Sequence, residues 1–198
     1  RCSMSKKCYR FFGGLLNTQE KWLNKMSEKG YRLVRTGKLL YEFEKCKPDE
    51  VTYCVEFIGE KSKESSIDYA NFLEDMGYKV FFKNINLNYS GGKVRWRPWA
   101  ERGGRIATNT TTFNREILIV EKANDGKPFE LHTSYDDKEK YYRNLRNPWL
   151  FLLLMFALFA VTKQSIIFGI FALVSVIPGS IYQIQIMKIR KEAKTQEW

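Results

Sequence analysis

The stretch NPWLFLLLMFALFAVTKQSIIFGIFALVSVIPGSIYQIQIMKIRK, residues 147–191, decides the architecture of this chain, because Lys163 is its only charge before Lys188. One straight helix from Pro148 to Ile186 would be about 58 Å long, far more than the ~30 Å hydrocarbon core of a bilayer. It would also place Lys163 near the bilayer centre, at a cost on the order of 3 kcal/mol. Burial in a soluble core is the other alternative, but an apolar run of about forty residues exceeds an ordinary core helix.

A pair of membrane-spanning helices fits this stretch better, and we predict a transmembrane helical hairpin over residues 148–187. Asn147 is a suitable helix cap, and Pro148 suits a first helical turn. The segment TKQS (162–165) makes the turn, and Pro178-Gly179 is expected to kink the second helix. Because the first helix would be only about 21 Å long, a re-entrant or interfacial first segment stays open as the alternative.

Basic residues flank the predicted hairpin at both of its ends. They are Lys138, Lys140, Arg143, Arg146, Lys188, Arg190, Lys191 and Lys194. By the positive-inside rule, both flanks face the cytoplasm. We therefore expect a multi-pass protein of the cell membrane with both termini cytoplasmic, a juxtamembrane helix over residues 132–147, and a basic cytoplasmic tail over residues 188–198.

The part of the chain before the hairpin contains an internal repeat. The segments EKWLNKMSEKGYRLV (20–34) and IDYANFLEDMGYKVF (67–81) align without a gap. Each reads as an amphipathic helix that ends at a glycine, Gly30 or Gly77, where a left-handed conformation needs no β-carbon. Each helix is followed by a strand-like run of aromatic and β-branched residues.

Further strand-like stretches surround the two predicted helices, at residues 7–12, 38–45, 52–58, 92–99 and 115–122. We take residues 92–99 as the counterpart of residues 38–45 in the second copy, and residues 115–122 as an additional strand. The order is strand, helix, strand, strand, twice over. This order predicts an α+β domain over residues 1–131, built from duplicated units in a ferredoxin-like sandwich.

These segments resemble a known bacterial family. The stretches EKWLNKMSEKGYRLV, YEFEKCKPDEVTYCVEF, LEDMGYKVF and the later ELHTSYDDKEKYYRNLR before two hydrophobic helices are similar to the family of domains of unknown function numbered twenty-eight-twelve, common in Firmicutes. The resemblance covers most of residues 6–147. It implies a membrane-anchored protein often encoded beside PadR-type repressors, and it implies no chemistry, because the role of the family is unassigned.

The sequence contains no recognisable set of catalytic or metal-binding residues. Its single histidine is His132, and its four cysteines form no CxxC pair, whereas zinc sites need closely spaced Cys and His ligands. The motifs GxSxG, HExxH, GxGxxG and the P-loop are absent. We therefore expect no enzyme activity, no catalytic residue, no cofactor and no metal, and reduced thiols in a cytosolic setting.

The stretch KVRWRPW (93–99) is the most suggestive surface in the chain. On a strand, Lys93, Arg95 and Arg97 share one face and Trp96 lies on the other, with Trp99 just beyond. Three interpretations stay open. The stretch is an edge strand whose tryptophan fills the core, a contact surface for anionic lipid or a protein partner, or a basic track with aromatic side chains for nucleic acid.

Small residues recur in the second hydrophobic segment, at Gly169, Ala172, Ser175 and Gly179. Small side chains let two helices approach closely. We expect this side to face another helix, either in the same hairpin or in a partner.

The net charge of +11 suits an anionic neighbour such as lipid headgroups or an acidic partner. We expect a non-enzymatic, membrane-anchored sensory or regulatory protein whose cytoplasmic domain binds a partner protein or small ligand at the inner leaflet. The alternatives are an accessory subunit of a membrane transporter complex and a membrane-tethered nucleic-acid-binding regulator. The expected partners are the lipid bilayer and a protein, or a second copy through the transmembrane helices, with nucleic acid disfavoured.

Overall fold

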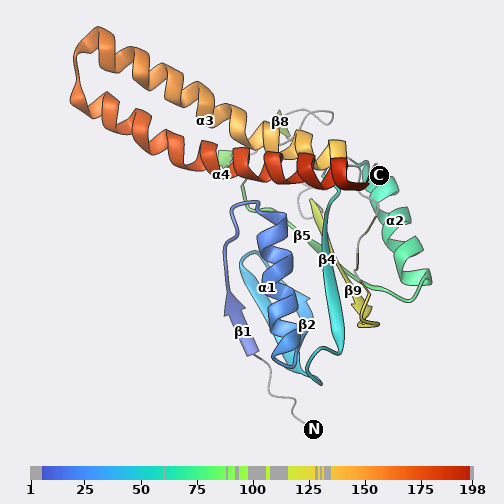
Figure 1. Ribbon diagram of the computed structural model, residues 1–198. Coiled ribbons are helices and arrows are strands. Elements are labelled where there is room, and N and C mark those ends of the chain that lie inside the picture. The colour runs from blue at the N-terminus through green and yellow to red at the C-terminus, as the bar shows by residue number, and fades with distance from the viewer. Residues whose placement is uncertain are drawn as a thin grey trace. The chain divides into compact units, whose positions relative to one another are not determined.

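The computed structural model describes residues 6–59, 61–87, 89–91, 94–97, 106–107, 116–127, 129, 131 and 135–196. They form two compact units. The first holds all the described strands and the helices α1 and α2, and the second holds the helices α3 and α4 (Figure 1). The predicted α+β class and the C-terminal pair of apolar helices are confirmed.

The first unit contains two three-stranded antiparallel sheets with the same strand order. A helix joins the first two strands of each sheet, and the third strand of each lies in the middle. The first sheet has the order β1-β3-β2 and the second has the order β4-β9-β5. The strands are β1 (Lys6–Tyr9), β2 (Tyr31–Thr36), β3 (Leu40–Lys45), β4 (Val51–Phe57), β5 (Lys79–Lys83) and β9 (Ile117–Ala123).

The identity of the last strand differs from the prediction. The stretch at 92–99 was expected to be the counterpart of β3, but its described part, β7 (Val94–Trp96), lies in a separate small sheet with β6 (Tyr89–Gly91) and β8 (Ile106–Ala107). The central position belongs to β9 instead. The first four residues of β9, Ile117 to Val120, are apolar and buried, and a strand covered on both faces needs such a continuous apolar run rather than an alternating one.

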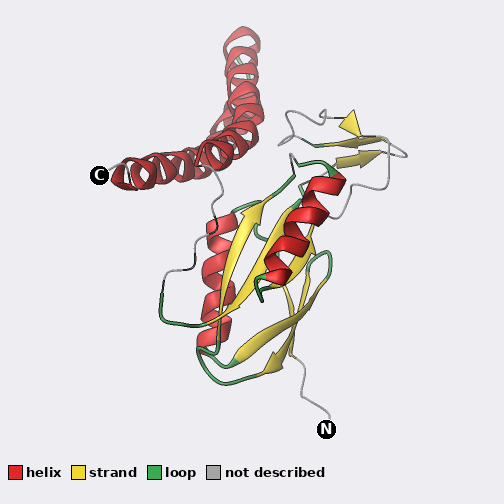
Figure 2. Ribbon diagram, turned by 90° about the vertical axis from the view of Figure 1, so that its right-hand side faces the viewer, coloured by secondary structure: helices red, strands yellow, loops and turns green. Residues whose placement is uncertain are grey.

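The helices α1 (Leu16–Glu28) and α2 (Lys63–Asp75) flank the strands of this unit, as Figure 2 shows. The first packs against β2 and β4, and the second packs against β5. A cluster of Ile58, Leu73, Leu118 and Val120 forms the core beneath α2. Both helices stop at the predicted glycines, which have positive φ angles of 75° at Gly30 and 87° at Gly77.

Gly30 is required for a second reason, because its backbone lies very close to the chain after β3. A Cβ atom added there would lie 2.9 Å from the Cys46 backbone oxygen. The Gly30 oxygen itself accepts a 3.0 Å hydrogen bond from the Cys46 backbone nitrogen. The glycine therefore ends α1 and allows the following strand to turn back along β3.

The second unit is a helical hairpin of α3 (Tyr135–Lys163) and α4 (Ile166–Gln196). The turn lies at Gln164, which has a positive φ of 49°, and Ser165. The helix start predicted at Asn147 is wrong, because α3 runs from Tyr135 straight through Pro148. Likewise α4 continues past Met187 to Gln196, so each helix combines an apolar segment with a polar extension.

Candidate functional site

The predicted contact surface at 93–99 is described only in part. β7 pairs Arg95 with Ser90 and Ala107, and it pairs Trp96 with Tyr89 and Ile106. Arg97 is half-buried. The other two predicted residues, Lys93 and Trp99, lie outside the described residues. The contact role of this surface stays a prediction.

The four small residues of α4 have different environments. Ala172, Ser175 and Gly179 are buried, and the Ser175 hydroxyl donates a 2.8 Å hydrogen bond to the Phe171 backbone oxygen. A Cβ atom added at Gly179 would lie 3.8 Å from the Cβ atom of Trp149 in α3. A Cβ atom added at Gly169 would have no neighbouring atom within 4 Å. The two helices of the hairpin are thus close together at Gly179, and there is open space around Gly169.

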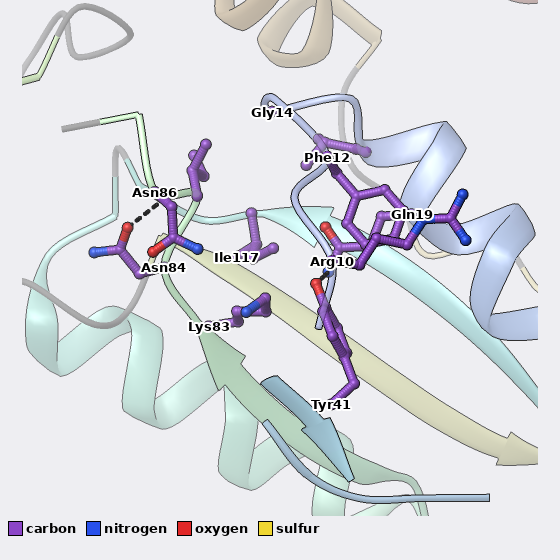
Figure 3. A pocket seen from close by; sticks show the side chains of 11 residues that line it. Arg10, Phe12, Gly14, Gln19, Tyr41, Lys83, Asn84, Asn86 and Ile117 are labelled. Carbon is purple, nitrogen blue, oxygen red and sulfur yellow. Dashed lines mark hydrogen bonds between the residues drawn. The ribbon is translucent and has the colours of Figure 1, made fainter. Parts of the chain in front are cut away.

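A small polar pocket lies inside the α+β unit (Figure 3). It lies where the first half of that unit, with the sheet β1-β3-β2, meets the second half, with the sheet β4-β9-β5. Its cavity volume is about 10 Å³, which is room for about one water molecule. We call it the Lys83 pocket. It is lined by Arg10, Phe12, Gly14, Leu16, Gln19, Tyr41, Lys83, Asn84, Ile85, Asn86 and Ile117.

Lys83, the last residue of β5, is the most unusual residue of this pocket, because its side chain is almost fully buried at 5% exposure. Its ammonium group donates hydrogen bonds to the backbone oxygens of Gly37 at 2.6 Å and Lys38 at 2.9 Å. It also lies 4.5 Å from the centre of the Tyr41 ring, a distance at which cation and ring attract each other. Burial lowers the pKa of Lys83 to about 8.

The remaining polar side chains of the described lining are neutral or basic. The Gln19 side-chain amide donates a 3.1 Å hydrogen bond to the Tyr41 hydroxyl, and burial raises the pKa of that hydroxyl. The Arg10 guanidinium lies 5.4 Å from the Phe12 ring centre. No carboxylate belongs to the described lining. The site therefore suits one water molecule or another small group that accepts hydrogen bonds.

Asn86 and Lys83 converge on the same backbone oxygen, that of Lys38 in the turn between β2 and β3. Asn86 is held in a left-handed conformation with a φ of 62°, and its backbone nitrogen donates to the Asn84 side-chain oxygen at 2.6 Å. This turn of the first half is thus fixed to the end of β5 in the second half. The pocket is a junction between the two halves as well as a cavity.

Comparison with protein families identifies the chain. Residues 16–154 match the family described as Protein of unknown function (DUF2812). The chain belongs to this family. The match confirms the resemblance seen in the sequence, and it runs from α1 into α3. No curated protein and no solved structure matches the chain.

The family match contains most of the Lys83 pocket, from Leu16 to Ile117, while Arg10, Phe12 and Gly14 precede it. No motif in the sequence indicates this pocket. Lys83 follows three apolar or aromatic residues of β5 and would ordinarily be read as a solvated end of a strand. Its burial depends on Gly37 and Lys38, which are 46 and 45 residues away.

Charged side chains join the two helices of the hairpin at the end away from its turn, near the start of α3 and the end of α4. Glu139 of α3 accepts hydrogen bonds from Arg190 of α4 at 2.7 and 3.0 Å, and it also pairs with Arg143 one turn along α3. Within the described part of the chain, no group of three or more His, Cys, Asp or Glu side chains could hold a metal ion. The contact between Glu139 and Arg190 connects α3 to α4.

Proposed function

We propose that the chain is a non-enzymatic, membrane-anchored sensory or regulatory protein. The α3–α4 hairpin is the anchor, and the α+β unit binds a partner protein or a small ligand at the inner leaflet. The observation that carries this proposal is the apolar surface of the hairpin. Both helices are long and apolar enough to span a membrane.

The exposure of these helices favours a lipid environment over a soluble core. In the most apolar 18-residue window of each helix, only 6% of α3 and 22% of α4 is buried within the protein. The exposed side chains include Phe151, Leu154 and Leu158 of α3, and Leu173 of α4 is 71% exposed. The core helix of a soluble protein would be mostly covered, because large exposed apolar patches are rare on soluble monomers.

The charge distribution supports an orientation with both helix ends on the cytoplasmic side. Lys163 at the turn is the only charge between Arg146 and Lys188, while the basic flanks lie at the opposite end of each helix. Cytoplasmic loops are enriched in Lys and Arg. On this orientation the protein is multi-pass, with both flanks and the α+β unit in the cytoplasm.

The α+β unit is the part that we propose to make contacts. Its two sheets share one strand order, which supports an origin by duplication of ferredoxin-like units. The Lys83 pocket, which bridges those units, is a candidate for small-ligand sensing. The residues predicted from the sequence for contact with a partner or with anionic lipid stay the candidates for that role: Lys93, Arg95, Trp96, Arg97 and Trp99.

Cysteine labelling tests the placement of this unit. Cys46 is half-buried, like Cys8, whereas Cys54 is buried, so Cys46 can serve as a native reporter when its labelling is located by peptide mass. Burial and the neighbouring Glu50 raise the pKa of Cys46, and labelling is therefore best done at about pH 8, where more thiolate is present. A maleimide that cannot cross membranes should label Cys46 only after cells are permeabilised.

A matched variant should give the opposite labelling pattern to that of Cys46. Gln164→Cys places a thiol in the exposed turn between α3 and α4, which the proposal puts outside the cell. This thiol should react in intact cells. Labelling of Cys46 in intact cells, or a full-length chain that stays in solution without detergent, would overturn the proposed placement.

A further inference from the structure

An apolar groove runs along the hairpin between α3 and α4. Its volume is about 490 Å³, which is within the range of small-molecule sites. Most of its lining surface is apolar. The lining residues are Arg146, Leu150, Leu153, Ser175, Val176, Gly179, Ser180, Gln183, Ile184 and Met187.

Arg146 gives this groove one charged end. Its guanidinium donates to the Gln183 side-chain oxygen at 2.7 Å and to the Asn147 side-chain oxygen at 2.8 Å, and both partners are neutral. Its Nε atom is buried and has no hydrogen-bond partner. Arg143 and Arg190 differ from it, because both pair with Glu139. Among the described side chains, Arg146 is thus a partly buried cation without an ion-pair partner.

The length and polarity of the groove match one lipid molecule in one leaflet. From Met187 to Ser175 the lining follows α4 for about 18 Å, which is close to half of the ~30 Å hydrocarbon core. Arg146 lies at the boundary where the apolar segment of α3 begins, together with Gln183 and Met187 of α4. A ligand that fits must carry an anion at one end and an alkyl chain at the other.

We propose that this groove binds an anionic phospholipid of the inner leaflet. The phosphate group accepts hydrogen bonds from Arg146, and one acyl chain lies along Leu150, Leu153 and Val176. An arginine is suited to this, because its planar guanidinium can bind phosphate through two hydrogen bonds. The inference rests on the proposed membrane insertion, and it adds a specific lipid class to it.

The experiment measures lipid retention by the full-length protein. The chain, purified in mild detergent with equal amounts of phosphatidylglycerol and phosphatidylcholine, is analysed by native mass spectrometry. We expect one phosphatidylglycerol to be retained in preference to phosphatidylcholine. Arg146→Gln should reduce its retention roughly tenfold or more, as expected for the loss of a charged hydrogen bond.

Two matched controls separate a defined site from general attraction. Lys188→Gln removes the same charge near the same boundary, but Lys188 does not line the groove, so retention should change little. Ser180→Phe fills the groove without changing charge and should abolish retention. Leu173→Phe places the same side chain on a highly exposed position of α4 outside the lining and should leave retention intact.

The outcomes distinguish this inference from the proposed function. Equal losses for Arg146→Gln and Lys188→Gln would mean diffuse surface attraction and would overturn the site. A change in oligomer size caused by Ser180→Phe, without a change in lipid retention, would assign the groove to a second copy instead and also overturn it. Flotation with vesicles tests insertion separately: a chain that floats but shows no lipid preference loses only this inference.

Discussion

The side-chain amide of Asn24 in α1 is hydrogen-bonded to both backbone groups of Tyr53 in β4. Its oxygen accepts from the Tyr53 nitrogen at 2.8 Å, and its nitrogen donates to the Tyr53 oxygen at 3.0 Å. β4 is an edge strand whose other side pairs with β9. The Glu20 carboxylate accepts from the Val55 nitrogen at 2.9 Å on the same edge. The polar face of α1 thus takes the place of a neighbouring strand, which protects an edge that could otherwise pair with another chain.

Replacing Asn24 should expose this edge. Asn24→Ala leaves the two backbone groups of Tyr53 without their partners, so we expect a loss of about 1–3 kcal/mol in the free energy of unfolding. Urea unfolding of the full chain in mild detergent measures this loss. Lys25→Ala, on the exposed side of the same helix, is the matched control and should change stability by less than about 0.5 kcal/mol. Equal effects of the two variants would contradict the assigned role of Asn24.

A partly buried ion pair connects β2 to β9, and its two members should respond differently to mutation, because only one of them is fully buried. The Arg32 Nη2 atom lies 2.6 Å from the Glu121 carboxylate, whose side chain is 2% exposed, while that of Arg32 is 34% exposed. The Tyr53 hydroxyl donates to Glu121 at 2.9 Å and accepts from the Leu33 backbone nitrogen at 2.7 Å. Arg32→Ala leaves a buried carboxylate without its cation and should cost up to about 3 kcal/mol.

Glu121→Gln should be milder, at about 1 kcal/mol, because it keeps an acceptor for Tyr53 and leaves Arg32 partly in water. The two unfolding curves, measured at neutral pH, decide the point. If Glu121→Gln proves the more harmful change, burial of the carboxylate does not govern this contact.

The buried Lys83 predicts an unusual dependence of stability on pH. Its pKa of about 8 is below the ordinary lysine value of 10.5. Between these values the unfolded chain binds more protons than the folded chain, so stability rises with pH through this window. Burial raises the pKa of Tyr41, Tyr53 and Tyr69. Their contribution is complete below the ordinary tyrosine value of 10.0 and is lost above it.

The test window is therefore pH 8 to 10, where the gain from Lys83 should approach about 2 kcal/mol. Lys83→Met removes the titrating group and should flatten the curve, whatever its effect on absolute stability. Lys79→Met, at the exposed start of the same strand, should keep the rise. A wild-type curve that is flat or falls across this window would refute the buried charge.

The packing of the hairpin can be tested by a disulfide. The Cβ position of Gly179 lies 3.8 Å from the Cβ atom of Trp149, which is a typical spacing for a disulfide. In a chain whose native cysteines are replaced, Trp149→Cys with Gly179→Cys should form an intramolecular bond on mild oxidation. Mobility on a non-reducing gel, checked by mass, reports it.

Trp149→Cys with Gly169→Cys is the control pair. A Cβ atom at Gly169 has no neighbour within 4 Å, so no bond should form within the chain. Cross-linking of the control pair, with none in the Gly179 pair, would mean that the helices pack in another register.

Local patterns in the sequence predicted where helices lie more accurately than they predicted which strands pair with each other. The ends of α1 and α2 at Gly30 and Gly77 were predicted correctly, because a left-handed helix end depends on one residue and its immediate neighbours. The apolar hairpin was likewise predicted from the length of one run. The helix start at Asn147 was wrong, since Pro148 is tolerated inside a helix here and residues 135–147 are themselves helical.

By itself, the sequence determined the division into an α+β part and an apolar helical pair, because composition, periodicity and length act over short stretches of chain. Only the tertiary structure decided that β9, and not the stretch at 92–99, is the central strand of the second sheet. It also decided that Lys83 is buried against a turn 45 residues away and that Arg146 ends an apolar groove. Burial and pairing of this kind depend on which distant surfaces meet, and no local pattern of residues contains that information.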